Sequence, residues 1–263
     1  MLIVDLNMKT VQLLFACVLA LPASAYASLE VYKLPGPDLS NTIQAQTRVL
    51  ELGLNGSESG CISWNGSANV SGAAACVGPA IPAFTGGSEQ PSSTTRTAGS
   101  LGIVDGNDLR IIFDANESSG DSISLDALRL LILNPTTGGL IFSADLANPC
   151  YVGPPNPNIT NPCVIDPTLT GNGKNDALIR LDAVQAAALD AAVLGSGVSM
   201  ANVRIGLLAN LSGPTSGGFE GFYVGNIATF DPPPLPEPGT LAIVALGLAC
   251  TLFARRRWAP KGY

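Results

Sequence analysis

Hydrophobic and polar residues alternate over short stretches through most of the middle of the chain. The stretches where this pattern predicts β-strands are 29–34, 47–54, 61–65, 101–104, 109–113, 122–133, 140–144, 203–211 and 222–230. The longest of them, 122–133, changes phase at Asp126 and Ala127, which predicts a bulge. Asp-Gly-Asn-Asp at 105–108 separates two of the stretches and predicts a hairpin turn.

A single stretch has the period of a helix. Strong helix formers fill 183–194, Asp182 stands at the N-cap position with Gln185 three residues later, and Gly195 is placed to end the helix. Residues 66–100 are rich in glycine and serine, which predicts a long loop or linker between two groups of strands. Many short strands with one short helix favour a mainly β fold, an antiparallel β-sandwich of the jelly-roll kind.

Both ends of the chain have a different character. Residues 1–27 contain a basic start at Lys9, an apolar stretch and small-x-small cleavage sites, which together predict a secretory signal peptide. Residues 232–263 begin with a proline-rich stretch, continue with the uncharged segment 240–254 and end in a basic tail. The uncharged segment predicts a transmembrane helix about 22 Å long, shorter than a usual span. A buried helix of a soluble core is the alternative, but a core helix rarely stands between prolines and arginines at a chain end.

The C-terminal segment resembles the PEP-CTERM sorting signal, over 236–257 only. The residues that carry the resemblance are Pro236, Glu237, Pro238, Arg255, Arg256 and Arg257. The resemblance implies an exported precursor that an integral-membrane exosortase recognises at the Pro-Glu-Pro element. It also implies a Gram-negative bacterium that makes exopolysaccharide. A sortase signal is the competing interpretation, but Pro238 stands where that signal requires threonine.

Composition narrows what the segment between the signals, residues 28–231, can do. Its 8 Lys and Arg residues against 18 Asp and Glu residues give a formal net charge of −10. Such a charge excludes binding to nucleic acid through phosphates and disfavours anionic membrane surfaces. The chain has no histidine, which excludes Ser–His–Asp and Cys–His catalysis and histidine-ligated metal sites. Paired carboxylates could still hydrolyse glycosides, but no motif nominates a pair, so we expect no enzyme.

Four cysteines remain once the signal peptide and the anchor segment are set aside: Cys61, Cys76, Cys150 and Cys163. An even number in an oxidising compartment predicts two disulfides. Three connectivities are open, and the local pairs Cys61–Cys76 and Cys150–Cys163 are favoured because each closes a loop with little apolar content. No pair has the C-x-x-C spacing of a metal site.

One part of the sequence is dense in side-chain oxygens. The candidate calcium ligands there are Asp105, Asn107, Asp108, Asp114, Asn116 and Asp121. Solvated turns are the alternative, because Asp and Asn favour turns for backbone reasons alone. Aromatic residues such as Trp64 and those at 219–223 could stack on sugars, or could pack in the core.

These observations predict an exported surface or extracellular-matrix protein that exosortase processes. The precursor is anchored in the membrane by its C-terminal helix, and calcium is the only cofactor that the sequence suggests. By the family resemblance, the role is structural or adhesive, within a biofilm or exopolysaccharide matrix. The alternative is a lectin-like carbohydrate-binding module with a loop calcium site.

Overall fold

The structure is a computed structural model that describes residues 28–32, 47–53, 57–75, 84, 86–115, 122–151, 159–160, 163–165, 177–213 and 218–226. The chain divides into two compact units, Met1–Ile227 and Ala228–Tyr263, and every described residue belongs to the first. The predicted signal peptide and the predicted transmembrane helix at 240–254 lie outside the described residues. In the described part, no helix is long and apolar enough to cross a membrane.

The described elements are mostly β-strands. They are β1 (Ser28–Tyr32), β2 (Thr47–Leu52), β3 (Glu58–Trp64), β4 (Asn69–Ser71), β5 (Arg96–Thr97), β6 (Leu109–Asp114), β7 (Ile123–Leu133), β8 (Leu140–Tyr151), β9 (Ile159–Thr160), β10 (Val164–Ile165), β11 (Ala177–Leu181), β12 (Arg204–Ser212) and β13 (Glu220–Asn226). One α-helix, α2 (Ala183–Gly195), and the 3-10 turns η2 (Ala73–Ala75), η3 (Ala98–Leu101) and η4 (Met200–Asn202) complete them. The mainly β character and the one helix confirm that part of the prediction.

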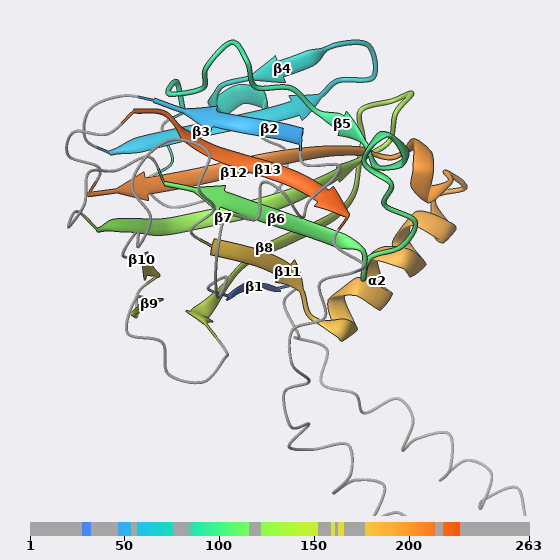
Figure 1. Ribbon diagram of the computed structural model, residues 1–263. Helices are drawn as coiled ribbons and strands as arrows, with labels where there is room; N and C mark the ends of the chain where they lie inside the picture. The colour runs from blue at the N-terminus through green and yellow to red at the C-terminus, as the bar shows by residue number, and fades with distance from the viewer. Residues whose placement is uncertain are drawn as a thin grey trace, which may run out of the picture. The chain divides into compact units, whose positions relative to one another are not determined.

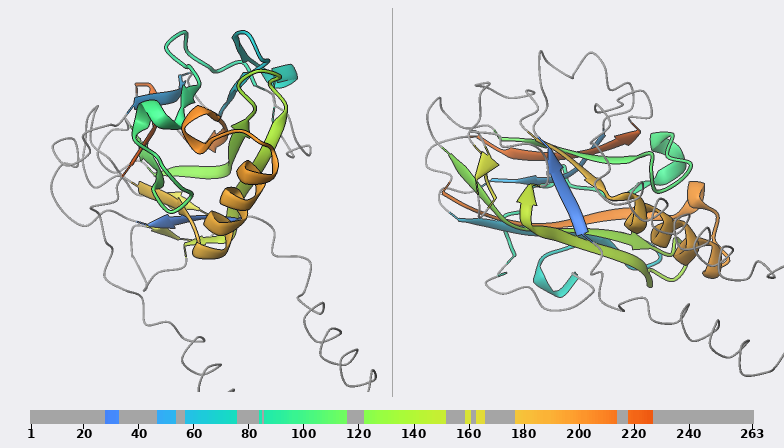
Figure 2. Two further views of the ribbon diagram at one scale, coloured as in Figure 1. Left: turned by 90° about the vertical axis from the view of Figure 1, so that its right-hand side faces the viewer. Right: turned by 90° about the horizontal axis from the view of Figure 1, so that it is seen from below.

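All of these strands belong to one hydrogen-bonded sheet (Figure 1). Its main path runs β2-β13-β6-β11-β1-β8-β7-β12-β3-β4, with β5 added to β12, and β10 and β9 added beside β7. β1 runs parallel to β8, whereas the other described pairings are antiparallel. β2, at one end of this path, contacts β3 and β12 near the other end, so the sheet curls (Figure 2). A sandwich needs two separate sheets, so the predicted β-sandwich is not confirmed.

The segment 86–95 joins the two ends of the curled sheet. The carbonyl of Ser88 accepts a hydrogen bond from Gly53, after β2, at 3.1 Å, and its N–H donates to Ser59 of β3 at 3.0 Å. These bonds satisfy backbone groups that would otherwise line two open sheet edges. We call the segment 86–95 the seam.

Glu89 fixes the seam through its side chain. One carboxylate oxygen accepts from the N–H groups of Cys61 at 2.6 Å and Gly72 at 3.0 Å, and the other accepts from Gly87 at 2.9 Å. The region predicted as a long loop or linker, 66–100, therefore includes the seam as well as β4, η2, β5 and η3. Its order comes from polar side chains that bind backbone groups, which a search for alternating hydrophobic residues does not detect.

The inner face of the curled sheet holds the hydrophobic core. On β7, Leu128, Leu130 and Ile132 belong to this core, while Leu131 and Leu133 pack in a smaller cluster on the opposite face. β7 is thus buried on both faces. The predicted bulge is confirmed, because β12 pairs with Ala127 and then with Leu125, so that Asp126 has no place in the register.

Helix α2 begins where its sequence predicts and ends one residue later, because Gly195 is still helical and Ser196 follows as the C-cap. The carboxylate of Asp182 accepts a hydrogen bond from the backbone N–H of Gln185 at 2.7 Å, which caps the helix, and the last helical residue is Gly195. Ala186 and Leu189 are buried against the sheet. The helix lies across one end of the curled sheet (Figure 2, left).

Two local predictions were wrong or incomplete. Residues 101–104, predicted as a strand, do not form one, because Leu101 ends the 3-10 turn η3 (Ala98–Leu101) and Gly102 follows with a φ of 71°. The predicted hairpin around 105–108 therefore has no first strand. β11 was not predicted from the sequence, yet it lies between β6 and β1 in the middle of the sheet. Its five residues are mostly apolar and are followed directly by the helix cap. They therefore lack the alternation of hydrophobic and polar residues by which a strand is predicted.

Candidate functional site

The acidic turn 105–108 binds its own backbone. Asp105 accepts from the N–H groups of Asn107 at 2.8 Å and Asp108 at 3.1 Å, and Asp108 accepts from Val104 at 3.1 Å. Oxygens committed in this way behave as turn caps. Within the described residues, no three or more His, Cys, Asp or Glu side chains are grouped so that they could hold a metal ion.

The structure separates the four predicted calcium ligands that it describes. Asp105, Asn107 and Asp108 precede β6 and Asp114 ends it, so the strand separates them by about 17 Å at 3.4 Å per residue. Calcium holds its ligands within about 2.6 Å, so one ion cannot bind both groups. Asn116 and Asp121 lie outside the described residues.

The aromatic ring of Trp64 is already occupied. The guanidinium of Arg204 lies 3.8 Å from the ring centroid, and the indole N–H donates to the carbonyl of Pro135 at 2.7 Å. The side chain also packs against the outer cluster that contains Leu131 and Leu208. A sugar could stack on this ring only after displacing Arg204.

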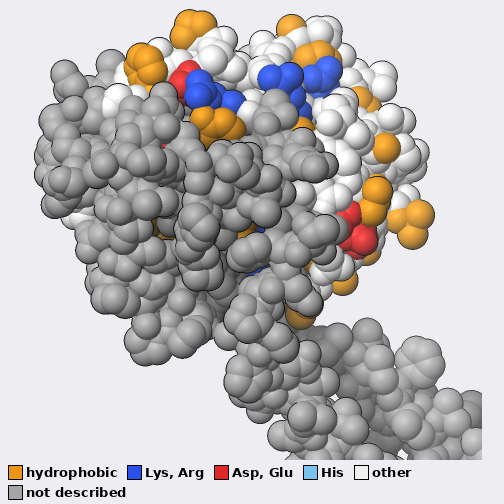
Figure 3. Space-filling model, in the orientation of Figure 1, with side chains coloured by type: hydrophobic (Ala, Val, Ile, Leu, Met, Phe, Trp, Pro, Cys, Tyr) orange, Lys and Arg blue, Asp and Glu red, His pale blue; other side chains and the backbone are white. Residues whose placement is uncertain are grey.

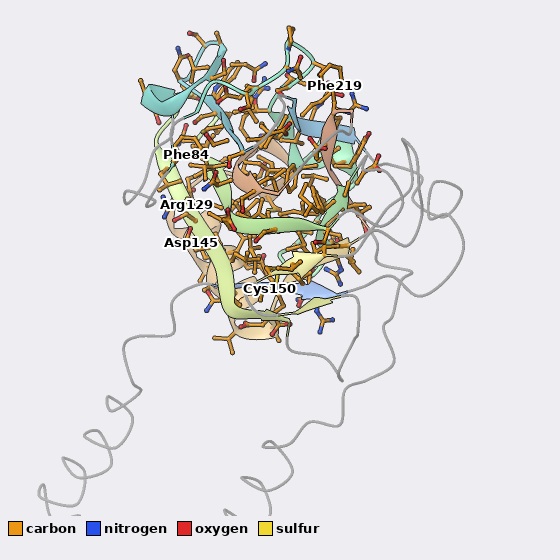
Figure 4. All side chains as sticks on the ribbon, turned by 90° about the vertical axis from the view of Figure 1, so that its left-hand side faces the viewer. Phe84, Arg129, Asp145, Cys150 and Phe219 are labelled. Carbon is orange, nitrogen blue, oxygen red and sulfur yellow. A yellow bond between two sulfur atoms is a disulfide. The ribbon has the colours of Figure 1, made fainter. Side chains whose placement is uncertain are left out.

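The other aromatic candidates differ in exposure. Phe222 is fully buried and packs against Phe113, with ring centroids 4.8 Å apart. Phe219 is 50% exposed, and its ring lies against the backbone of Gly53 (Figure 4). Thus Phe222 belongs to the core, while Phe219 remains accessible.

A polar cluster on β2 and β13 was not predicted from the sequence. Arg48 donates to the hydroxyl oxygen of Tyr223 from Nη2 at 2.7 Å and from Nε at 3.2 Å, and it also bonds to Glu51. The hydroxyl of Ser92, in the seam, donates to the same Glu51 carboxylate. Burial lowers the pKa of Arg48, but the hydrogen bond with Tyr223 and the charge of Glu51 outweigh it, so its pKa is raised.

This cluster joins residues 175 positions apart in the sequence, which only the pairing of β2 with β13 brings together. A second charged pair links β7 and β8, where Arg129 donates from Nη2 to the Asp145 carboxylate at 3.0 Å (Figure 4). Arg129 is buried, whereas the Asp145 side chain is 53% exposed. Both groups cross-link strands.

Cys150 and Cys163 form a disulfide, with Cα atoms 5.5 Å apart. Cys150 belongs to β8 and Cys163 directly precedes β10, and both are buried. Cys61 is disulfide-bonded as well, and Cys76, the partner that the sequence favours for it, lies outside the described residues.

The sorting residues Pro236, Glu237 and Pro238 and the arginines at 255–257 also lie outside the described residues. In comparisons with known families, residues 234–257 match the PEP-CTERM protein-sorting motif. The chain matches no curated protein and no solved structure. The motif makes the chain an exported, membrane-anchored precursor that exosortase processes.

Proposed function

We propose that the processed protein is a structural or adhesive component of the cell surface or extracellular matrix, associated with exopolysaccharide. The match of 234–257 to the sorting motif carries the proposal, since it implies an exported precursor. The domain itself acts without catalysis. Its disulfides and its side-chain cross-links between strands suit a protein that must keep its shape outside the cell.

A structural role has more support than a lectin-like one. The ring of Trp64 is covered by Arg204, Phe222 is buried, and Tyr223 bonds with Arg48. Sugar-binding sites usually present exposed aromatic faces beside polar groups, and Phe219 alone does not make such a platform.

The experiment is to produce the full chain in an exosortase-containing host and in the same host without exosortase. We expect the intact mass in the first host to lack the segment 240–254, and the protein to fractionate with the surface polysaccharide. Glu237→Ala should leave the precursor uncut, while Asp126→Ala, an exposed acidic control in the folded domain, should be processed normally. Retention of an uncut chain in both hosts would refute processing, and release of a cut chain free of polysaccharide would refute the matrix role.

A further inference from the structure

The chain enters and leaves the folded domain at one end of the sheet. β1 begins at Ser28, and its Leu29 pairs with Leu181, the last residue before the cap of α2. β13 ends at Asn226, which pairs with Leu109 at the start of β6. We call this end, which α2 covers, the α2 end.

The exit point is tied to helix α2 by hydrogen bonds. The side-chain amide of Asn226 donates to the carbonyl of Gly102 at 2.6 Å, and four residues later the N–H of Gly106 donates to Asp190 of α2 at 2.8 Å. A Cβ atom at Gly106 would lie 2.5 Å from the carbonyl oxygen of Ala186, so the loop rests directly on the helix. These contacts connect Asn226, the last described residue, to α2.

The exposed positions of α2 carry no polar side chain, and its one acidic residue, Asp190, is half-buried and bonded to Gly106. The exposed residues are Ala183, Val184, Ala187, Ala188, Ala191, Leu194 and Gly195. Val184 is 66% exposed and Leu194 is 82% exposed. A helix on the surface of a soluble protein normally turns charged and polar residues outward, so this composition is typical of a helix with a covered face.

Exposed apolar side chains gather at the same end. Among the described residues, five large hydrophobic side chains are exposed, and Val104, Leu140, Val184 and Leu194 all belong to segments at the α2 end. The fifth, Phe219, precedes β13 at the opposite end. Figure 3 shows hydrophobic side chains, with acidic side chains beside them, on the side where Figure 1 places α2; other hydrophobic side chains lie elsewhere on the same face.

We propose that the α2 end rests on the lipid surface of the membrane that holds the precursor. The described chain ends at Asn226 on this face, and the sorting motif begins at residue 234. The 13 residues from 227 to 239 can span at most about 43 Å before the uncharged segment begins. Such a tether keeps the apolar face at a high effective concentration near the bilayer. This increases the bound fraction of a weakly binding face without any further contact.

A bilayer suits this face better than a second copy of the chain. The precursor is anchored in the membrane by its own chain, so the membrane is always within reach of the α2 end. A second copy would bring another acidic domain and add electrostatic repulsion. The binding is hydrophobic, and the net negative charge of the domain makes neutral lipid the preferred surface. Cleavage at the sorting signal ends the tethering and releases the face.

The test places a photoreactive benzoylphenylalanine at Ala188, in the full chain reconstituted into neutral phosphatidylcholine–phosphatidylethanolamine vesicles. The control places the same group at Phe219, an exposed position at the opposite end. We expect lipid adducts at position 188 to exceed those at position 219 about tenfold, because the tether favours one orientation. Flotation of the vesicles with the chain shows separately that the anchor has inserted.

A second set of variants tests the apolar contact itself. Val184→Glu combined with Leu194→Glu should lower the lipid adduct at position 188 by about fivefold, since two charges oppose burial in lipid. The melting temperature should remain unchanged, because both side chains are exposed. Phe219→Glu should leave the adduct as it was. Equal adducts at both probe positions, no lipid adduct at either, or a cross-link from position 188 to a second copy would each overturn the proposal.

Discussion

Replacing Glu89 with alanine tests whether the seam holds the curled sheet together. The carboxylate of Glu89 accepts three hydrogen bonds from backbone N–H groups, two of them through one oxygen. With a net contribution of about 1 kcal/mol for each bond, the variant should lose about 3 kcal/mol of unfolding free energy. For a domain of this size, that corresponds to a fall of about 6–12 °C in melting temperature.

The assay is scanning calorimetry of the oxidised protein, with amide hydrogen exchange as a local measurement. In Glu89→Ala, exchange should accelerate at Cys61, Gly72 and Gly87, the three donors to the carboxylate. Asp126→Ala is the matched control, since Asp126 is exposed on the β7 bulge and accepts from Ser124. It should cost no more than about 0.5 kcal/mol. If the two variants melted alike and the three amides stayed protected, the seam would not depend on Glu89.

Three further perturbations probe other parts of the domain. Arg204→Ala should shift the fluorescence emission of Trp64, the one tryptophan within 28–231, to longer wavelength, and an unchanged spectrum would mean that Arg204 does not shield the ring. Cys150→Ser combined with Cys163→Ser removes a disulfide between residues 13 positions apart, and should lower the unfolding free energy by about 3 kcal/mol in urea titration. An unchanged urea midpoint would contradict this. Asp182→Ala removes the cap of α2 and should cost about 1 kcal/mol in the same titration, unlike Asp182→Asn, which keeps a capping oxygen.

The elements that could be predicted from the sequence are those whose signals are local. Asp182 and Gln185 mark the start of α2 because capping depends on residues three positions apart. The bulge at Asp126 was visible because a change of phase in the hydrophobic pattern must be absorbed by the register. Both signals need no knowledge of the rest of the fold.

The curl of the sheet and the polar clusters could not be predicted in this way. β1 pairs with β8 and β11, and no local pattern states which strands will be neighbours. Likewise Arg48 and Tyr223 meet only after β2 and β13 have paired. The calcium prediction rests on nearness in sequence, and the length of β6 between Asp105 and Asp114 could be known only once that strand was placed.

The placement of the last strand has a consequence for export. β13 lies between β2 and β6, so these two strands have no bridge between them until the end of the domain has been synthesised. Pairing between strands so distant in sequence makes folding slow. The chain therefore stays unfolded, and able to pass through an export channel, until β13 has been synthesised. Chains truncated before Glu220 should accordingly be digested by protease. Resistance to protease should appear only in chains that include all of β13, through Asn226.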